Sequence, residues 1–200
     1  AAVCAERDAV IISDEIHADL VFSGSRHIPI ASLNAETAQR TITLIAPSKT
    51  FNIPGLCCSL AVIENETLRR QFMHARRGLV GEVNLLGQTA ALAAYRHGAE
   101  WLDTALQYMQ ANRDLLVKTV REELPQLHIT RPEGTYLAWI DCRDAGLGND
   151  PYKFFLEKAK VALNDGARFG KGGEGFVRLN FACPRSILEE ALSRMVKSLQ

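Results

Sequence analysis

The sequence predicts an α/β protein in two parts, and three observations lead to this prediction. Short apolar runs rich in β-branched residues occur near the start of the chain, which is the pattern of strands in a buried sheet. Residues 82–124 then show the helical spacing of apolar residues. Strand and helix patterns return after this stretch, as expected for a separate α+β unit. We therefore expect one domain at residues 1–97 and a second at residues 98–200, in which a joining helix precedes the smaller unit.

Three strands are expected in the first domain. The apolar run at residues 9–13 is typical of a strand that is buried on both faces, and it ends at Asp14. Similar runs cover residues 41–46 and residues 59–63. The third run follows the second too closely for a helical crossover, so we expect it to pair antiparallel or to lie elsewhere in the sheet.

Helices are expected between and after these strands. A short helix fits the polar connection between the first two strands, and Asn65 is a good N-cap for a helix that begins at Glu66. Helical spacing covers residues 82–97, and a second long stretch covers residues 99–124 until Pro125 ends it. The length of this second stretch suggests a helix that joins two domains.

The second domain alternates between strand and helix patterns. Strands are expected at residues 135–141 and 176–181, and an Asp-Pro pair opens a helix over residues 150–163. A glycine cluster at residues 170–175 fits a hairpin-like loop, and residues 187–199 have the apolar spacing of a final helix.

The composition gives no electrostatic reason to expect nucleic acid or a membrane surface as partner. Acidic and basic residues balance at 23 each in 200 residues, so the net charge is 0. No apolar run approaches the roughly eighteen residues of a membrane span. The cysteines are odd in number and show no C-x-x-C spacing, which predicts reduced thiols of a cytoplasmic protein, mostly in the core, and no metal site. They are Cys4, Cys57, Cys58, Cys142 and Cys183.

Lys49 is the first candidate for chemistry, because it follows a buried strand directly. Burying an ammonium group is costly unless the charge is paired or neutralised, and an amine partly removed from water is a better nucleophile. A loop lysine that reaches solvent is the alternative. A phosphate-binding P-loop is disfavoured, since no glycine precedes Lys49 and Thr50 at the required spacing.

Asp14 and Arg178 are the next candidates. Asp14 ends a predicted strand, so its carboxylate and Lys49 are expected to face the crevice at the carboxyl ends of the sheet. A cap or turn residue is the alternative for Asp14, and His17 is expected to hydrogen-bond from the same turn unless it is structural. Arg178 alternates with apolar residues in a predicted strand, and a guanidinium held there suits bidentate capture of a carboxylate. An arginine on an edge strand in solvent is the alternative.

Four motifs occur in order along the chain. They are SDEIHADLVF at 13–22, APSKTFNIPGL at 46–56, PEGTYLAW at 132–139, and ALNDG at 162–166 followed by FVRLNFA at 176–182. Together they resemble the PatB/MalY type of cystathionine β-lyase within the class I and II aminotransferases, and the resemblance covers essentially the whole chain. It implies the C-terminal part of an aminotransferase-like fold that uses pyridoxal 5′-phosphate (PLP), comprising part of the large-domain sheet and the small α+β domain.

The resemblance also implies roles for five residues. Lys49 matches the lysine that holds the cofactor covalently and then moves the substrate's α-proton, and Asp14 matches the aspartate beside the pyridine nitrogen. Ser48 and His17 match positions near the cofactor, with the Ser48 hydroxyl within reach of its phosphate. Arg178 matches the arginine that binds the substrate's α-carboxylate. No metal is implied.

Three positions differ from the broader aminotransferase pattern. His17 stands where many relatives have a tyrosine, Cys57 where many have a phosphate-binding arginine, and Ala46 where some have a phosphate-contacting serine. The lyase branch tolerates these changes. They therefore favour a lyase over an aspartate-type aminotransferase.

The implied activity is β-elimination on a sulfur-containing L-amino acid by a cytoplasmic homodimer, releasing a thiol, pyruvate and ammonia. Transamination on the same fold is the first alternative. The second is a catalytically incomplete fragment: family members carry an N-terminal part with further cofactor-binding residues, nothing here matches that part, and the first residue is not Met. From this we expect the isolated 200 residues to be inactive and to bind PLP weakly or not at all.

Overall fold

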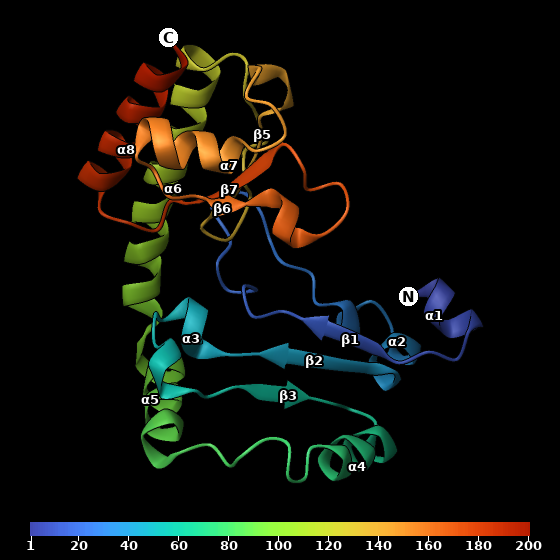
Figure 1. Ribbon diagram of the computed structural model, residues 1–200. Coiled ribbons are helices and arrows are strands. Elements are labelled where there is room, and N and C mark those ends of the chain that lie inside the picture. Colours follow the sequence, from blue (N-terminus) through green and yellow to red (C-terminus); the bar gives the residue numbers. More distant parts are fainter. The chain divides into compact units, whose positions relative to one another are not determined.

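The computed structural model describes residues 1–200, which divide into two compact units, Ala1–Thr104 and Ala105–Gln200 (Figure 1). The boundary falls inside the long helix α6 (Ala99–Glu123). The domain assignment made from the sequence, at residues 1–97 and 98–200, stays a prediction. Neither α6 nor any other helix combines the length and the apolar character that crossing a bilayer requires.

The first unit contains a three-stranded sheet in the order β1-β2-β3. Strand β1 (Ile11–Asp14) pairs parallel with β2 (Thr41–Ile45), with Asp14 opposite Leu44. Strand β3 (Leu60–Val62) pairs antiparallel with β2, which confirms one of the two arrangements expected from the short connection. The carboxyl ends of β1 and β2 therefore lie at the same edge of the sheet.

Three helices of the first unit begin at asparagine caps. Asn34, Asn65 and Asn84 each accept a hydrogen bond from a backbone N–H of the first turn. The cap at Asn65 is confirmed, and the helix expected from residue 82 begins at Leu85 because Asn84 caps it. The helices are α1 (Ala2–Glu6), α2 (Ala35–Gln39), α3 (Pro47–Thr50), α4 (Glu66–Ala75), α5 (Leu85–His97) and the start of α6, with 3-10 turns at Ile30–Ser32 and Pro54–Leu56.

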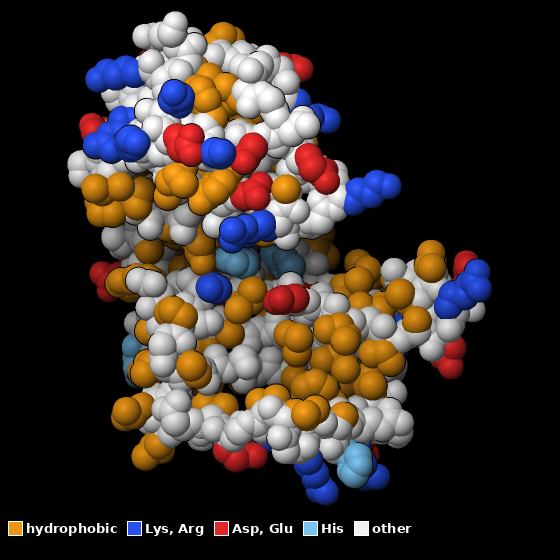
Figure 2. All heavy atoms as spheres, in the orientation of Figure 1, with side chains coloured by type: hydrophobic (Ala, Val, Ile, Leu, Met, Phe, Trp, Pro, Cys, Tyr) orange, Lys and Arg blue, Asp and Glu red, His pale blue; other side chains and the backbone are white.

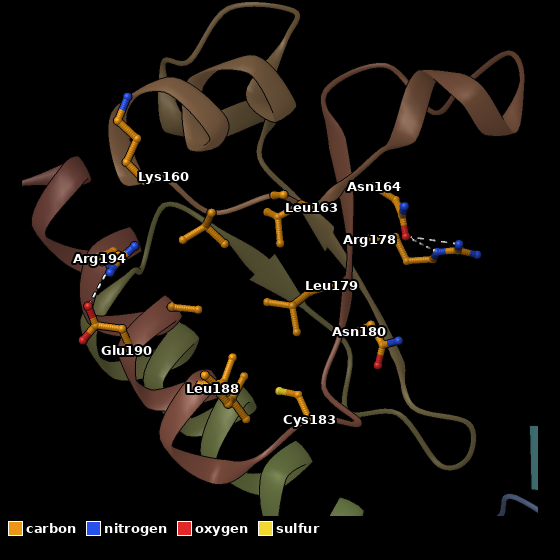
Figure 3. A pocket seen from close by; sticks show the side chains of 14 residues that line it. Lys160, Leu163, Asn164, Arg178, Leu179, Asn180, Cys183, Leu188, Glu190 and Arg194 are labelled. Carbon is orange, nitrogen blue, oxygen red and sulfur yellow. Dashed lines mark hydrogen bonds and ion pairs between the residues drawn. The ribbon is translucent and has the colours of Figure 1, made fainter. Parts of the chain in front are cut away.

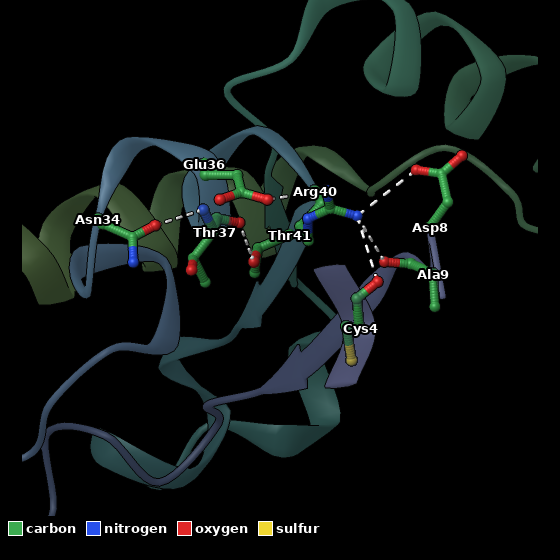
Figure 4. A network of polar contacts seen from close by, with 8 residues as sticks. All are labelled: Cys4, Asp8, Ala9, Asn34, Glu36, Thr37, Arg40 and Thr41. Carbon is green, nitrogen blue, oxygen red and sulfur yellow. Dashed lines mark hydrogen bonds and ion pairs between the residues drawn. The ribbon is translucent and has the colours of Figure 1, made fainter. Parts of the chain in front are cut away.

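Arg40 anchors the start of the parallel strand pair (Figure 4). Its Nη1 donates to the backbone oxygens of Cys4 and Ala9, and its Nη2 pairs with Glu36 at 3.3 Å. The backbone oxygen of Arg40 accepts from the N–H of Ile11 at 2.8 Å. One arginine thus joins α1, α2 and the first residue of β1.

The expectation that the first strand is buried on both faces is wrong for this chain. Ile11 is buried, but Ile12 is 68% exposed, and Val62 on β3 is 56% exposed. Figure 2 shows hydrophobic side chains gathered over the region of β1, β2 and β3. The reason is that this chain leaves the side chains on one face of the sheet, such as Ile12 and Val62, uncovered.

The second unit contains a four-stranded antiparallel sheet in the order β4-β5-β7-β6. The strands are β4 (His128–Ile129), β5 (Leu137–Asp141), β6 (Asn164–Asp165) and β7 (Phe176–Asn180). The loop at residues 170–175 connects β6 to β7, two antiparallel neighbours, which confirms the expected hairpin-like connection.

Helices α6 and α8 (Arg185–Leu199) supply most of the helical part of the core of this unit. Their buried side chains include Leu116, Val120, Leu188, Leu192 and Met195. These side chains share the core with Val177 and Leu179 from β7, whose intervening residue Arg178 is on the opposite face.

The helix expected over residues 150–163 is shorter in the structure. Helix α7 (Pro151–Phe154) continues as a π-helical turn, Phe155–Ala159, and ends where Lys160 adopts a left-handed conformation with φ 57°. The following residues are extended, because Asn164 and Asp165 pair with β7. Competition from the sheet ends the helix.

All five cysteines are free thiols. Only Cys142 is buried, whereas Cys57 is exposed and the others are half-buried. The expectation that most of them are core residues is therefore wrong. Burial and the nearby charge of Asp141 raise the pKa of the Cys142 thiol to about 12, so this thiol stays protonated.

Candidate active site

Asp14 lies at the carboxyl end of β1, where its side chain is exposed. Its Oδ1 accepts a hydrogen bond from the backbone N–H of Ile16 at 3.3 Å, which is the only hydrogen bond of this carboxylate in the structure. Three of the acceptor positions of the two oxygens are thus open to other donors. Asp14 also lines a cavity of about 340 Å³ together with Ala46 and Ser59.

Lys49 lies on α3, the short helix that follows β2. Pro47 at the first helical position suits this start, because its fixed φ is already helical. Lys49 is half-buried and takes part in no hydrogen bond or ion pair. Ser48, beside it, is also half-buried, and its backbone oxygen accepts from the N–H of Ile53 at 3.1 Å.

One buried hydrogen bond links α3 to the turn after β1. Thr50 is only 2% exposed, and its hydroxyl donates to Oδ2 of Asp19 at 2.9 Å. Asp19 and His17 lie in the turn at residues 16–19, which follows Asp14 at the end of β1. The hydrogen bond from Thr50 therefore links this turn to the helix that carries Lys49.

Helix α5 supports the segment after Lys49. Phe51 packs against Tyr95 with ring centroids 5.7 Å apart, and burial together with Asp19 and Cys58 raises the pKa of Tyr95. An added Cβ at Gly87 would lie 2.4 Å from the backbone oxygen of Leu56, so only glycine allows this close approach.

Glu15 holds the loop that follows β1. It is 7% exposed; its Oε1 accepts from the Ser13 hydroxyl and from the N–H of Ile30, and its Oε2 pairs with His27 at 2.8 Å. Burial opposes ionisation of Glu15, but these hydrogen bonds outweigh it and hold the pKa of the carboxyl below its usual range. His17 is half-buried in the turn that this arrangement supports.

Arg178 lies on β7 in the second unit, where it is half-buried. Its Nε and Nη2 both donate to Oδ1 of Asn164 at 3.2 Å, and its guanidinium carbon lies 4.4 Å from the centre of the Phe169 ring. Burial raises the pKa of Tyr136, and the charge of Arg178 opposes that rise. The guanidinium is thus held in place by neighbours within its own unit.

A cavity of about 590 Å³ lies beside β7 on the other face of the sheet. Figure 3 shows Leu179 pointing into it, whereas Arg178 and Asn164 point away. Lys160 and an ion pair between Arg194 and Glu190 lie at its edge. Arg178 and Asn164 nevertheless belong to the residues that line this cavity.

Four of the five candidate residues belong to the first unit: Asp14, His17, Ser48 and Lys49. Arg178 belongs to the second unit, so a crevice shared by Asp14, Lys49 and Arg178 stays a prediction. Sequence reasoning did not identify Glu15, Asn164 or Phe169 as supporting residues. Glu15 and Asn164 lie inside the quoted motifs, which was the available signal, whereas Phe169 stands outside them.

The groups that the first unit brings together can hold a phosphorylated pyridine aldehyde. A carboxylate such as that of Asp14 stabilises a protonated ring nitrogen, and an amine such as that of Lys49 condenses with an aldehyde. The hydroxyl of Ser48 can donate to a phosphate. The chemistry of this donor set therefore fits PLP.

The family model described as "Aminotransferase class I and II" matches residues 1–195. Cystathionine β-lyase PatB of Bacillus subtilis (strain 168) is 38% identical over 199 residues, covering 98% of this chain and 51% of that protein. This chain therefore spans about half the length of the curated relatives that it matches.

Solved structures give the same picture. Cystalysin from Treponema denticola, whose crystal structure contains PLP, matches with a TM-score of 0.93 at 35% identity, covering 99% of this chain and 51% of that chain. The crystal structure of OvoB matches with a TM-score of 0.94 at 48% identity, covering 100% of this chain and 52% of that chain.

Proposed function

We propose a function that starts from the family: this chain belongs to the class I and II aminotransferases. We propose that the whole protein is a PLP-dependent carbon–sulfur β-lyase. Its substrates are S-substituted L-cysteines such as L-cystathionine. The carbon–sulfur bond breaks, and water completes the reaction. One thiol, one pyruvate and one ammonium ion form from each substrate and one water.

The observation that carries this proposal is the common edge of β1 and β2. Asp14 ends β1, and the segment with Ser48 and Lys49 follows β2, which is parallel to β1. The hydrogen bond from Thr50 to Asp19 ties the two segments together. A carboxylate and an amine fixed at one sheet edge are the two groups that this chemistry needs from the chain.

Four residues would hold the cofactor. Lys49 Nζ is the covalent attachment point, the Asp14 carboxylate pairs with the ring nitrogen, the Ser48 hydroxyl binds the phosphate, and His17 lies near the ring. When bound, PLP supplies an electron sink for the negative charge that forms at the α-carbon.

Two residues would act on the substrate. Lys49 Nζ would take the proton from the α-carbon of the substrate. Arg178 binds the α-carboxylate and so fixes the direction of the α-hydrogen. Orientation of this kind lowers the barrier by restricting the reacting groups to a productive geometry.

Transamination is the second candidate, and the family itself favours it as the alternative. Both reactions begin with removal of the α-proton. They differ in whether a leaving group departs from the β-carbon. His17, Cys57 and Ala46 depart from the broader aminotransferase pattern, which supports the lyase.

The test uses the protein as its gene encodes it, supplied with PLP and L-cystathionine. We expect thiol and pyruvate in equal amounts without an added 2-oxo acid, and we expect Lys49→Ala to lower the rate by about 10²–10⁴-fold. Lys171→Ala, an exposed lysine of the glycine-rich loop, is the matched control with an unchanged rate. Amino transfer to a 2-oxo acid without thiol release would establish the transaminase instead, and absence of both reactions would contradict an enzyme of this type.

The proposed enzyme is a cytoplasmic homodimer. Five free thiols suit a reducing compartment. Exposed apolar side chains at Leu79, Leu85 and Leu86 suit a surface that a second copy covers. Recovery of the protein from an oxidising compartment with its cysteines in disulfides would contradict the location.

A further inference from the structure

The guanidinium of Arg178 is held from two directions by residues that bind neither cofactor nor substrate in the proposed function. Asn164 lies opposite Arg178 across the β6–β7 pair, and its Oδ1 accepts from Nε and from Nη2 at 3.2 Å each. Phe169 lies against the flat face of the guanidinium, at 4.4 Å from its ring centre. Asn164 fixes the rotation of the group within its plane, and Phe169 fixes the plane itself.

These contacts leave one edge of the guanidinium available. The Nε–Nη2 edge is occupied by Asn164, and the two side-chain hydrogen bonds of Arg178 both run to that residue. The Nη1 hydrogens and the outer hydrogen of Nη2 are therefore the donors left for a ligand. A carboxylate can accept from Nη1 and Nη2 side by side, because the planar group presents its donors as a rigid fork.

Phe169 is itself fixed by a stack of side chains on one face of the sheet. Its ring meets Trp139 edge to face with centroids 5.4 Å apart, and Trp139 stacks on Phe176 at 5.4 Å and 18°. The guanidinium carbon of Arg143 lies over the Phe176 ring, 4.8 Å from its centre. Phe169, Trp139 and Phe176 thus form a continuous row of ring contacts.

The backbone that carries Phe169 is equally restricted. The 3-10 turn Gly166–Phe169 is held against the glycine-rich loop. An added Cβ at Gly173 would lie 2.1 Å from the backbone oxygen of Gly166, and one at Gly166 would lie 2.4 Å from the oxygen of Gly173. Only glycine fits at both positions, so the glycine pair sets where Phe169 stands.

We propose that Phe169 and Asn164 are positioning residues for the carboxylate site: they orient the Arg178 guanidinium so that its Nη1–Nη2 edge receives the substrate's α-carboxylate. This inference rests on the proposed function, in which Arg178 binds that carboxylate. A long arginine side chain loses rotamer freedom when it binds a ligand. Here Phe169 and Asn164 restrict the Arg178 side chain before the ligand binds. This strengthens binding of ligands that carry the carboxylate and leaves binding of ligands without it unchanged.

The experiment compares two ligands that differ only in the carboxylate. In the PLP-loaded protein as its gene encodes it, dissociation constants are measured for S-methyl-L-cysteine and for 2-(methylthio)ethylamine, from the change in cofactor absorbance on rapid mixing. The ratio of the two constants reports the contribution of the carboxylate. We expect Phe169→Leu to bring the two dissociation constants about two- to fivefold closer together, which is the size expected for loss of an exposed cation–π contact. We expect a similar change for Asn164→Ala, which loses the hydrogen bonds to Arg178.

Matched variants separate positioning from general damage to the sheet. Phe176→Leu removes a ring from the same stack that lies under Arg143 rather than under the Arg178 guanidinium, so we expect it to narrow the ratio less than Phe169→Leu does. Phe169→Tyr keeps the ring and restores the ratio. An unchanged ratio in Phe169→Leu, or equal narrowing in Phe176→Leu, would overturn the inference.

Arg178→Ala distinguishes this inference from the proposed function on which it rests. If Arg178→Ala narrows the ratio and Phe169→Leu does not, the positioning role is wrong and the role of Arg178 stands. If Arg178→Ala leaves the ratio unchanged, the assignment of Arg178 as the carboxylate site is wrong, and the positioning role is wrong with it.

Discussion

At the scale of single residues, Asp14 and Lys49 have different environments. Asp14 is exposed and keeps only one hydrogen bond, to the N–H of Ile16, whereas its sequence neighbour Glu15 is buried with three partners. The two adjacent carboxylates therefore have different roles. Glu15 stabilises the loop through its hydrogen bonds, and the Asp14 carboxylate keeps acceptor positions open for a ligand.

Asp14→Asn tests the role proposed for the free carboxylate. An amide cannot stabilise a protonated ring nitrogen by charge, so we expect turnover of L-cystathionine to fall about 10²–10³-fold while the fold persists. Steady-state kinetics and the cofactor spectrum give the measurement. Asp19→Asn is the control, since its remaining oxygen can still accept from Thr50. Equal losses in both variants would contradict a specific role for Asp14.

Glu15 makes stability depend on pH in a defined direction. Its folded pKa lies below the unfolded value of about 4.3, so its contribution is present above that pH and is lost as the pH falls through the folded pKa. We expect Glu15→Gln to lower the free energy of unfolding by about 1–2 kcal/mol near neutral pH, with a smaller difference below pH 4. Urea unfolding at several pH values measures this. Glu64→Gln, at an exposed position, should give no such trend. A loss of unfolding free energy in Glu15→Gln that does not change with pH would contradict the lowered pKa of Glu15.

The sequence offered candidate residues for the site but did not identify the neighbours that contact them. Asp14 and Lys49 were identifiable because polar residues at the ends of apolar strands are unusual and because the surrounding motifs are specific. Phe169 was not, since an aromatic residue between two glycine-rich stretches has no periodic pattern. Its contact with Arg178 follows from the close approach of Gly166 and Gly173, which the sequence alone does not reveal.

At the scale of elements, strands and long helices followed their patterns closely. Strand β2 and helix α6 lie within a residue of their predicted bounds, because each has a long, uniform apolar pattern. The predicted helix was longer than α7, since Lys160 adopts a left-handed conformation that propensity does not favour. Strand β6 was not predicted, because its two residues are extended only through their pairing with β7.

Gly87 tests how α5 supports the segment that carries Lys49. Alanine at this helical position gains about 1 kcal/mol in propensity, but its Cβ would meet the backbone oxygen of Leu56 at 2.4 Å, and overpacking costs about 1–3 kcal/mol. We expect Gly87→Ala to lower the melting temperature and to weaken PLP binding, measured by thermal unfolding and absorbance titration. Gly81→Ala, with nothing near its added Cβ, should change neither. If the Gly87→Ala protein is as stable as the Gly81→Ala protein, the close approach of Gly87 to the backbone of Leu56 is not what supports this segment.

At the scale of the whole molecule, the chain spans about half the length of its relatives. Val10, Ile12, Leu60 and Val62 leave one side of the sheet apolar and exposed. The pattern of the strands predicted burial on both faces, and the chain itself covers only one. The apolar pattern of the strands therefore did not reveal which face of the sheet is exposed.

The exposed apolar surface of the first unit supports the proposed homodimer. We expect the whole protein to have twice the mass of one chain in light scattering at micromolar concentration, and Leu85→Asp to lower that mass. Leu85 is 76% exposed. Ile187→Asp, 59% exposed in the second unit, is the control that should remain dimeric. A monomer at these concentrations without any substitution would contradict the homodimer.

The position of the cofactor amine can be measured most directly by chemical trapping. The whole protein is loaded with PLP, reduced with borohydride so that the cofactor stays fixed to the amine that holds it, and digested for mass spectrometry. We expect the pyridoxyl group on the peptide that contains Lys49. A pyridoxyl group on another lysine, such as Lys153 or Lys171, or a protein that takes up no label, would contradict the assignment of Lys49 and with it the proposed chemistry.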